Sequence, residues 1–226
     1  MIPNDVTGRV FCLRIGVASA TGFAIDVEKR QYLVTSRKFA MGASPRAPLL
    51  VLLENQWYNL GGTVIGHAPG EVDISVIVLN SIVAKPDLEL LPDPELLYGQ
   101  DVYLFGYPYG WWGETKKAFL GRPIPFVRKA TVSCIENGPE GAHRNFLDGY
   151  NSPGSAGSPV VYLDDPSGKF KVTSVVSCYS FVEQPIYRGN VALDENVRLN
   201  KGIIITYGIQ HVLEIIRKKP IGISIP

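Results

Sequence analysis

The chain of 226 residues has little cysteine and almost no net charge, and its apolar runs are all shorter than a membrane span. Its three cysteines, Cys12, Cys134 and Cys178, are too few and too scattered for a disulfide framework or a cysteine-rich zinc site, so we expect reduced, buried thiols. The 22 Lys and Arg against 21 Asp and Glu give a net charge of +1, which disfavours electrostatic capture of nucleic acid or anionic lipid. The first eleven residues also lack a basic stretch followed by an apolar one, the pattern of a secretory signal peptide. We therefore expect a cytoplasmic protein with no nucleic-acid partner, no membrane partner, no metal and no cofactor.

Glycine and proline are frequent, at 23 and 17 residues, and many of them stand at the edges of Val-, Ile- and Leu-rich runs. This pattern is typical of short strands joined by turns, and 46% apolar residues suffice for a buried core. The runs fall into two groups, which predicts an all-β fold of the barrel or sandwich type. The first group spans residues 10–17, 22–26, 31–36, 49–53, 57–60, 63–66 and 74–79, and the second spans 102–105, 129–135, 145–147, 159–163, 171–177 and 202–206.

Two other segments differ from this pattern. Residues 84–100 combine three prolines with several acidic residues, which predicts a connecting segment because proline interrupts both helices and central strands. Near the end of the chain, apolar residues recur at helical spacing over residues 209–217, and basic residues follow at 217–219, where the helix dipole favours positive charge. We expect a helix there that ends before Pro220 and packs against the strands.

Residues 149–161 read GYNSPGSAGSPVV and end in a strand-like run. Gly154 and Gly157 allow a tight turn that aims successive N–H groups at one point, and such a nest can hold a negative charge. Taken alone, the stretch is better explained as an ordinary Gly/Ser loop.

Three more stretches accompany this turn in a fixed order: TGFAIDVEKRQYLVTSRKFA, the run DISVIVL opened by Asp73, and YLFGYPYG. In that order the pieces resemble the two-barrel trypsin-like peptidases, in particular the bacterial and organelle branch without disulfides. The resemblance runs from about residue 10 to the final helix. It implies two six-stranded antiparallel β-barrels and a C-terminal α-helix. Residues 1–85 would form the first barrel, 86–100 the inter-barrel linker, and 101–226 the second barrel with the helix.

Two of the three catalytic positions depart from the family pattern. The family places its histidine in T-x-x-H, its aspartate at the start of a D-I-A-V-L-like strand, and its serine in G-x-S-G-[GS]-P. Here Lys38 ends the stretch TSRK, Ala156 is the third residue of GSAGSP, and only Asp73 matches. Because the triad needs a nucleophile, a base and a group that orients the base, the chain as written is expected not to cleave peptides by this route.

Neighbouring groups are not expected to replace the missing ones. Ser155 and Ser158 flank Ala156, but adjacent side chains in a tight turn point in different directions. A nearby carboxylate favours a charged ammonium, so the resemblance implies a Lys38–Asp73 ion pair rather than a lysine base, and a solvated loop lysine is the alternative. The histidines His67, His143 and His211 lie outside the T-x-x-H stretch, and we expect them at the surface or in capping roles.

The resemblance also implies that the binding surface survives. An oxyanion hole needs only main-chain N–H groups, here those of Gly154 and Ala156. Ser177, Cys178 and Tyr179 resemble the family's edge strand, which pairs with the backbone of a peptide by strand addition. A cluster of aromatic residues follows the strand at 102–105 and either forms an exposed patch for a partner or folds back over the second barrel. These residues are Tyr107, Tyr109, Trp111 and Trp112.

Three functions remain open from the sequence. The first is a pseudoprotease that binds peptide or protein partners. The second is a genuine serine endopeptidase in an inactivated form, since a serine-to-alanine change at position 156 is the smallest inactivating substitution. The third is a structural or oligomerising module, which predicts bulky residues filling the site.

Overall fold

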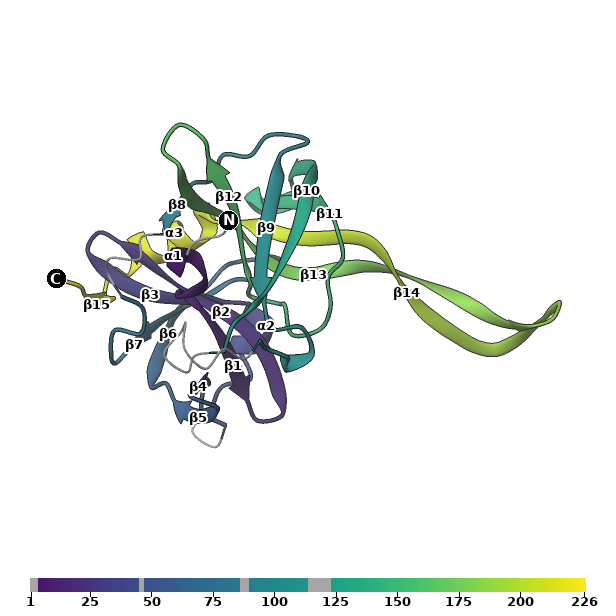
Figure 1. Ribbon diagram of the computed structural model, residues 1–226, viewed down its shortest axis with the longest axis horizontal. Helices are drawn as coiled ribbons and strands as arrows, with labels where there is room; N and C mark the ends of the chain where they lie inside the picture. The colour runs from purple at the N-terminus through teal and green to yellow at the C-terminus, as the bar shows by residue number, and fades with distance from the viewer. Residues whose placement is uncertain (1–3, 45–46, 86–89, 114–122) are drawn as a thin grey trace.

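The structure is a computed structural model that describes residues 4–44, 47–85, 90–113 and 123–226. It consists mostly of strands, arranged in two antiparallel sheets, with few and short helices (Figure 1). None of the helices in the described ranges is long and apolar enough to cross a bilayer.

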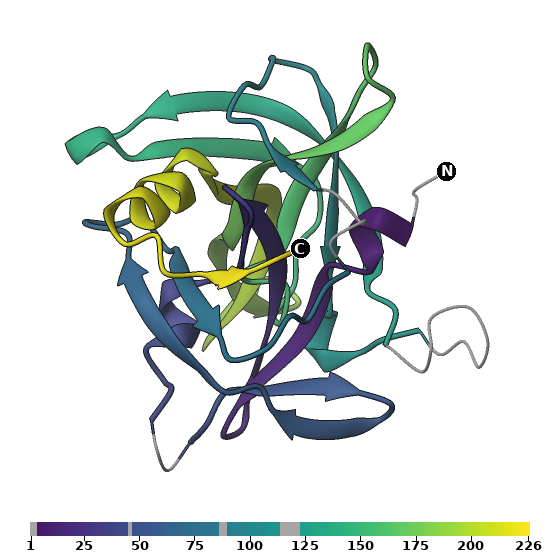
Figure 2. The same ribbon diagram turned by 90° about the vertical axis from the view of Figure 1, so that its left-hand side faces the viewer.

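The first sheet is a curled sheet with the strand order β5-β4-β1-β2-β3-β7-β6. The strands of this sheet bury apolar residues. Phe11, Leu13, Leu33 and Ile77 belong to one core cluster. Strand β15 joins the sheet by pairing with β3, so the end of the chain returns to the first sheet (Figure 2). The strands are β1 Val10–Ile15, β2 Ala18–Val27, β3 Arg30–Thr35, β4 Leu50–Leu53, β5 Gln56–Asn59, β6 Gly62–His67, β7 Ser75–Leu79 and β15 Ile223–Ser224.

The second sheet closes into a ring. Its order is β12-β9-β10-β11-β14-β13-β8, and β12 also pairs with β13. Leu104, Val132, Leu147 and Ile204 are buried together inside it. The strands are β8 Leu91–Pro92, β9 Asp101–Gly106, β10 Phe126–Asn137, β11 His143–Asp148, β12 Pro159–Asp164, β13 Lys169–Arg188 and β14 Val191–Gly208.

The all-β class, the two groups of strands and the final helix are confirmed in this outline, but two barrels of six strands each are not. In the described residues the first sheet has eight strands and stays open between β5 and β6, and β8 adds a seventh strand to the second sheet. Strand β8 lies within the predicted linker and runs parallel to β13. Residues 86–89, also part of that linker, lie outside the described residues, and the proposed domain boundaries stay a prediction.

Four short helical segments and one longer helix complete the described fold. The short ones are α1 Asn4–Thr7, α2 Arg37–Ala40 and the 3₁₀ turns η1 Pro108–Gly110 and η2 Pro139–Gly141. Helix α3, Gln210–Lys218, confirms the predicted helix and buries Val212, Ile215 and Ile216. It follows β14 but packs on β6 and β7, where Ile215 occupies the space beside Gly66 (Figure 2). Helix α3 therefore connects the two sheets.

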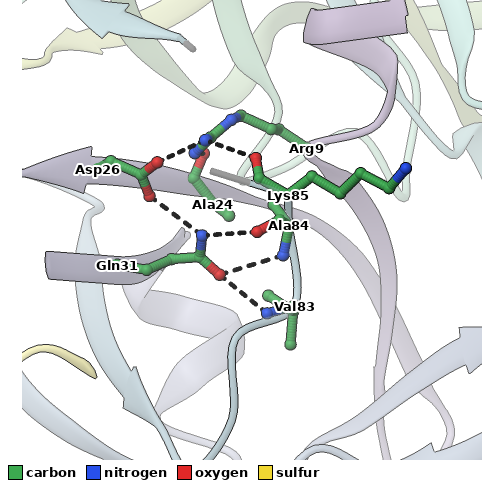
Figure 3. A network of polar contacts seen from close by, with 7 residues as sticks. All are labelled: Arg9, Ala24, Asp26, Gln31, Val83, Ala84 and Lys85. Atoms are coloured by element: carbon green, nitrogen blue, oxygen red, sulfur yellow. Dashed lines mark hydrogen bonds and ion pairs between the residues drawn. The ribbon is translucent and has the colours of Figure 1, made fainter. Parts of the chain in front are cut away.

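A buried polar network fixes the end of the first group of strands (Figure 3). The Arg9 guanidinium is fully buried; it pairs with Asp26 and donates to the Lys85 carbonyl at 3.1 Å. Gln31 accepts from the N–H groups of Val83 and Ala84 at 2.8 and 3.1 Å and donates to Asp26 at 3.1 Å. The network holds residues 83–85 against β2 and β3 just before the connecting segment.

The ends of β13 and β14 form a long hairpin arm that projects from the body of the molecule (Figure 1). Its side chains are largely exposed, including Tyr187 at 61% and Val191 at 66%. The arm turns at Gly189 and Asn190, between the paired residues Arg188 and Val191. A glycine with positive φ (62°) at the first turn position is typical of a two-residue hairpin. No strand was predicted over residues 180–201, although this turn signal is present in the sequence.

Candidate functional site

Asp73 lies where three elements meet. It precedes β7, its side chain is buried with 2% exposure, and both of its carboxylate oxygens accept hydrogen bonds. Oδ1 accepts from the main-chain N–H of Lys38 in α2 at 2.8 Å, and Oδ2 accepts from the Ser177 hydroxyl in β13 at 2.8 Å. The aspartate therefore joins the first turn of α2 to the second sheet.

Lys38 is held through its main chain, while its side chain is exposed. Helix α2 starts at the N-cap Ser36, whose hydroxyl accepts from the N–H of Phe39 at 3.4 Å. The expected ion pair between the Lys38 ammonium and Asp73 does not form, because the carboxylate contacts the N–H of Lys38 instead. Within the described residues, the Lys38 ammonium has no hydrogen-bond or ion-pair partner.

The glycine-rich turn before β12 packs directly against the first sheet. The carbonyl of Ala156 accepts from the N–H of Thr21 at 2.9 Å, and the hydroxyl of Thr21 donates to the carbonyl of Gly154 at 2.9 Å. A Cβ on Gly157 would lie 2.1 Å from the carbonyl of Thr21 and 3.0 Å from the N–H of Ser36. Only glycine fits this approach, which also has a positive φ of 85°. The turn therefore packs against Ser36, which precedes Lys38 by two positions in the sequence.

Two N–H groups of this turn are free. Ser155 N–H donates to the carbonyl of Ser152 at 3.2 Å, and Gly157 N–H donates to the carbonyl of Val176 at 2.8 Å. Within the described chain, the N–H groups of Gly154 and Ala156 donate no hydrogen bond. The turn thus leaves the two main-chain donors that an oxyanion hole requires.

The edge of β13 beyond this turn is also free. β12 pairs with β13 as far as Val175, and Val176 exchanges hydrogen bonds with the carbonyl of Ser158 and the N–H of Gly157. From Ser177 onward, no strand in the described ranges pairs with the edge of β13 that faces away from β14. Ser177 is 7% exposed, and Cys178 and Tyr179 are half-buried. The open edge therefore begins where the turn ends.

This arrangement of two sheets and the turn between them is shared with known structures. No protein-family model and no curated protein sequence matches the chain. Among solved structures, the inactive Ser343Ala mutant of Rv3671c from M. tuberculosis H37Rv is similar, with a TM-score of 0.60 and 18% identity over 96% of this chain and 91% of that one. The fold is that of the trypsin-like serine proteases.

The HtrA-type protease AlgW is similar as well. Two of its structures with a tripeptide, one of them the S227A variant, match with a TM-score of 0.59 and 18% identity over 95% of this chain. The chain spans 61% of the length of those AlgW chains. At this identity the likeness concerns the fold of the chain and not its activity.

The two serines near Ala156 are both buried. Ser155 is 6% exposed and Ser158 is fully buried. The Ser158 hydroxyl lies 2.4 Å from the position that a Cβ on Gly106 would occupy, and it has no hydrogen-bond partner among the described residues. Both serines line a small pocket together with Leu104 and Phe126 of the second sheet.

The aromatic residues after β9 divide between core and surface. Tyr107 is 1% exposed and donates its hydroxyl to the carbonyls of Val10 and Pro123 at 3.2 and 3.0 Å, so it cannot belong to an exposed patch. Trp112 packs partly against the core, whereas Tyr109 and Trp111 are 59% and 65% exposed with ring centroids 6.1 Å apart. This turn also contacts the site, because Tyr109 N–H donates to the carbonyl of Pro153 at 2.7 Å.

The histidine and cysteine expectations need two corrections. His211 is buried with 4% exposure, because it lies on the inward-facing side of α3. Its Nε2 accepts a hydrogen bond from the main-chain N–H of His143 at 3.1 Å. Burial lowers the pKa of His211. Cys134 is exposed on β10, whereas Cys12 is buried as expected, and burial raises the pKa of its thiol to about 12.

Sequence reasoning missed two residues that organise the site. Thr21 contacts Ala156, Gly154 and also Tyr107, whose N–H donates to the Thr21 hydroxyl at 3.1 Å. Arg128 donates to the carbonyl of Tyr150 at 2.8 Å and to the hydroxyl of Ser152 at 2.9 Å, and so holds the chain that leads into the turn. Thr21 opens the stretch TGFAIDVEKRQYLVTSRKFA, but the pattern gives it no site role, and Arg128 lies outside the quoted stretches, so only the folded contacts reveal both roles.

Proposed function

We propose that this protein is a non-catalytic domain of the trypsin-like serine protease fold that binds an extended peptide or protein segment along β13. The observation that carries the proposal is the unpaired edge of β13 at Ser177, Cys178 and Tyr179, which begins beside the turn of Ala156. Main-chain donors and acceptors on a free strand edge can pair with an added strand, and this needs no catalytic group.

The chemistry of the triad-equivalent positions Lys38, Asp73 and Ala156 supports the absence of catalysis. A methyl group at Ala156 offers no nucleophile. The carboxylate of Asp73 accepts from the main chain of Lys38 and from Ser177, and within the described residues no histidine contacts it. Ser155 and Ser158 are buried and offer no replacement.

The exposed aromatic pair supplies a second contact for a protein partner. Tyr109 and Trp111 are exposed side by side, and tyrosine and tryptophan contribute strongly to binding energy at interfaces. Their turn is hydrogen-bonded to Pro153 beside the glycine-rich turn. A partner that covers the turn of Ala156 can therefore also contact these two rings.

The experiment is a backbone N-methyl scan of a bound peptide. A pool of randomised octapeptides is selected on the immobilised protein, and one enriched peptide is then N-methylated at each position in turn. Strand addition predicts that affinity falls at alternate positions, because only every second residue of an edge-bound strand donates to β13. Equal losses at all positions, or no enriched peptide, would contradict the proposal. Hydrogen exchange gives a second readout: among Ser177, Cys178 and Tyr179, only the amides that point away from β14 should gain protection on binding.

A further inference from the structure

The free N–H groups of the glycine-rich turn and the substitution at Lys38 together favour the binding of an anion. The N–H groups of Gly154 and Ala156 have no partner in the described chain, and the Lys38 ammonium has none either. The three groups belong to segments in contact, since Gly157 packs on Ser36 at the start of α2. Two of the groups are hydrogen-bond donors and the third is a cation. The serine hydroxyl and the histidine imidazole of the family pattern are absent from positions 156 and 38. Such a set suits a bound anion, because charge-assisted hydrogen bonds from N–H groups are the strongest that a carboxylate can accept.

Asp73 is a negative group that contacts this set through the main chain of Lys38. Its carboxylate is 2% exposed, and its oxygens are occupied by the N–H of Lys38 and the hydroxyl of Ser177. The neighbouring Arg37 is not free to neutralise a ligand, because it donates to the carbonyls of Ala68 and Gly70 at 2.9 and 2.8 Å. Lys38 is therefore the cation that faces solvent at this position.

The direction of β13 decides which end of a bound segment reaches the anion site. Val176 is hydrogen-bonded to the turn through Gly157 and Ser158, and the chain of β13 then runs away from the turn toward the arm. A segment added antiparallel to this edge runs the opposite way, so its C-terminal end arrives at the turn. Antiparallel pairing is also the more common arrangement, and it is the one that β13 makes with β12 and β14.

We infer that the site receives the free C-terminal carboxylate of the bound segment, held by the N–H groups of Gly154 and Ala156 and by the ammonium of Lys38. This inference rests on the proposed function and specifies its ligand: a segment that ends at the turn instead of passing through it. Alanine at position 156 is smaller by one oxygen atom than the serine of the family pattern, so it takes up less space beside a bound carboxylate.

The test compares two pools of randomised octapeptides that differ only at the end, one with a free carboxylate and one with a carboxamide. Affinities of enriched peptides are measured by fluorescence anisotropy in both forms. We expect the carboxylate form to bind roughly tenfold tighter or better, as for charge-assisted hydrogen bonds. Lys38→Gln should remove most of this preference. The control Lys218→Gln, at an exposed position at the end of α3, should keep it.

The outcomes separate this inference from the proposed function. Equal affinity of the two forms, with the alternating N-methyl pattern intact, would overturn the carboxylate site and leave strand addition standing. Binding of neither form would overturn both. A carboxylate preference that survives Lys38→Gln and produces no amide shift at Gly154 and Ala156 in NMR spectra would place the carboxylate elsewhere and also refute the inference.

Discussion

Ser177 donates its hydroxyl hydrogen to the carboxylate of Asp73 across 2.8 Å, although the two residues are 104 positions apart in the chain. The contact crosses from the start of β7 to β13. The same carboxylate accepts from Lys38, so one buried side chain ties together the segment that would hold a base and the strand that would hold a peptide. On the proposed function the role of Asp73 is structural, and substitution of Asp73 tests this.

Asp73→Asn should leave stability nearly unchanged, whereas Asp73→Ala should lower the free energy of unfolding by about 2 kcal/mol. The amide can still accept from the N–H of Lys38 and pair with the Ser177 hydroxyl, but alanine leaves both buried donors unsatisfied. Urea unfolding of the two variants measures the difference. Equal destabilisation by both would show that the charge itself is required, contrary to this account.

The wild-type protein should not react with a fluorophosphonate probe, and neither Lys38→His nor Ala156→Ser alone should change this. Triad members act as a unit, so restoring one of them restores little. Labelling of the wild type that disappears in Ser155→Ala would contradict the proposed inactivity. The double variant with His at 38 and Ser at 156 distinguishes the alternative: peptide hydrolysis would favour an endopeptidase in an inactivated form, and continued inactivity a site that has diverged for binding.

Asp26→Ala should cost about 3 kcal/mol of stability, because it leaves the fully buried Arg9 guanidinium without its carboxylate. The matched control is Asp101→Ala, which removes an ion pair to Lys129 whose two side chains are more than half exposed. Such surface pairs contribute little, so the control should unfold at the wild-type denaturant midpoint. A small loss in Asp26→Ala would mean that the carbonyls of Ala24 and Lys85 suffice for Arg9.

The strands were predictable because the pattern that indicates them, an apolar run between turn residues, lies within a few neighbouring positions. Apolar runs separated by glycine and proline mark β1 to β7 and β9 to β12 within a few residues, and the spacing of Ile209, Val212 and Ile216 marks α3. The hairpin arm was also readable, since Gly189 and Asn190 are a two-residue turn between strand-like runs. It was missed because its strands bury too little to show a strong apolar pattern.

The contacts between distant segments were not predictable in the same way. The resemblance to a protease family placed Lys38 beside Asp73, but only the fold shows that its main chain, and not its ammonium, makes the contact. The same holds for Thr21, which has no motif of its own and yet holds Gly154, Ala156 and Tyr107 together. Side-chain direction depends on packing from several elements, which one sequence does not encode locally.

Acidification below neutral pH should destabilise the protein through His211. Burial lowers the pKa of its imidazole, with the nearby His143 acting in the same direction and Glu214 in the opposite one. The native state therefore binds fewer protons than the unfolded state, so stability is present above the unfolded value of 6.5 and falls as the pH drops through it. Protonation also removes the Nε2 acceptor that the N–H of His143 uses at 3.1 Å.

The variant His211→Gln isolates this effect, because a glutamine side chain can accept from His143 and does not titrate. Its urea midpoint should change less between pH 7.5 and pH 5.5 than that of the wild type. Lys218→Gln on the same helix should keep the wild-type pH dependence, since its exposed side chain lies outside the buried pair. An unchanged slope in His211→Gln would assign the acid sensitivity to another group and remove His211 from this account.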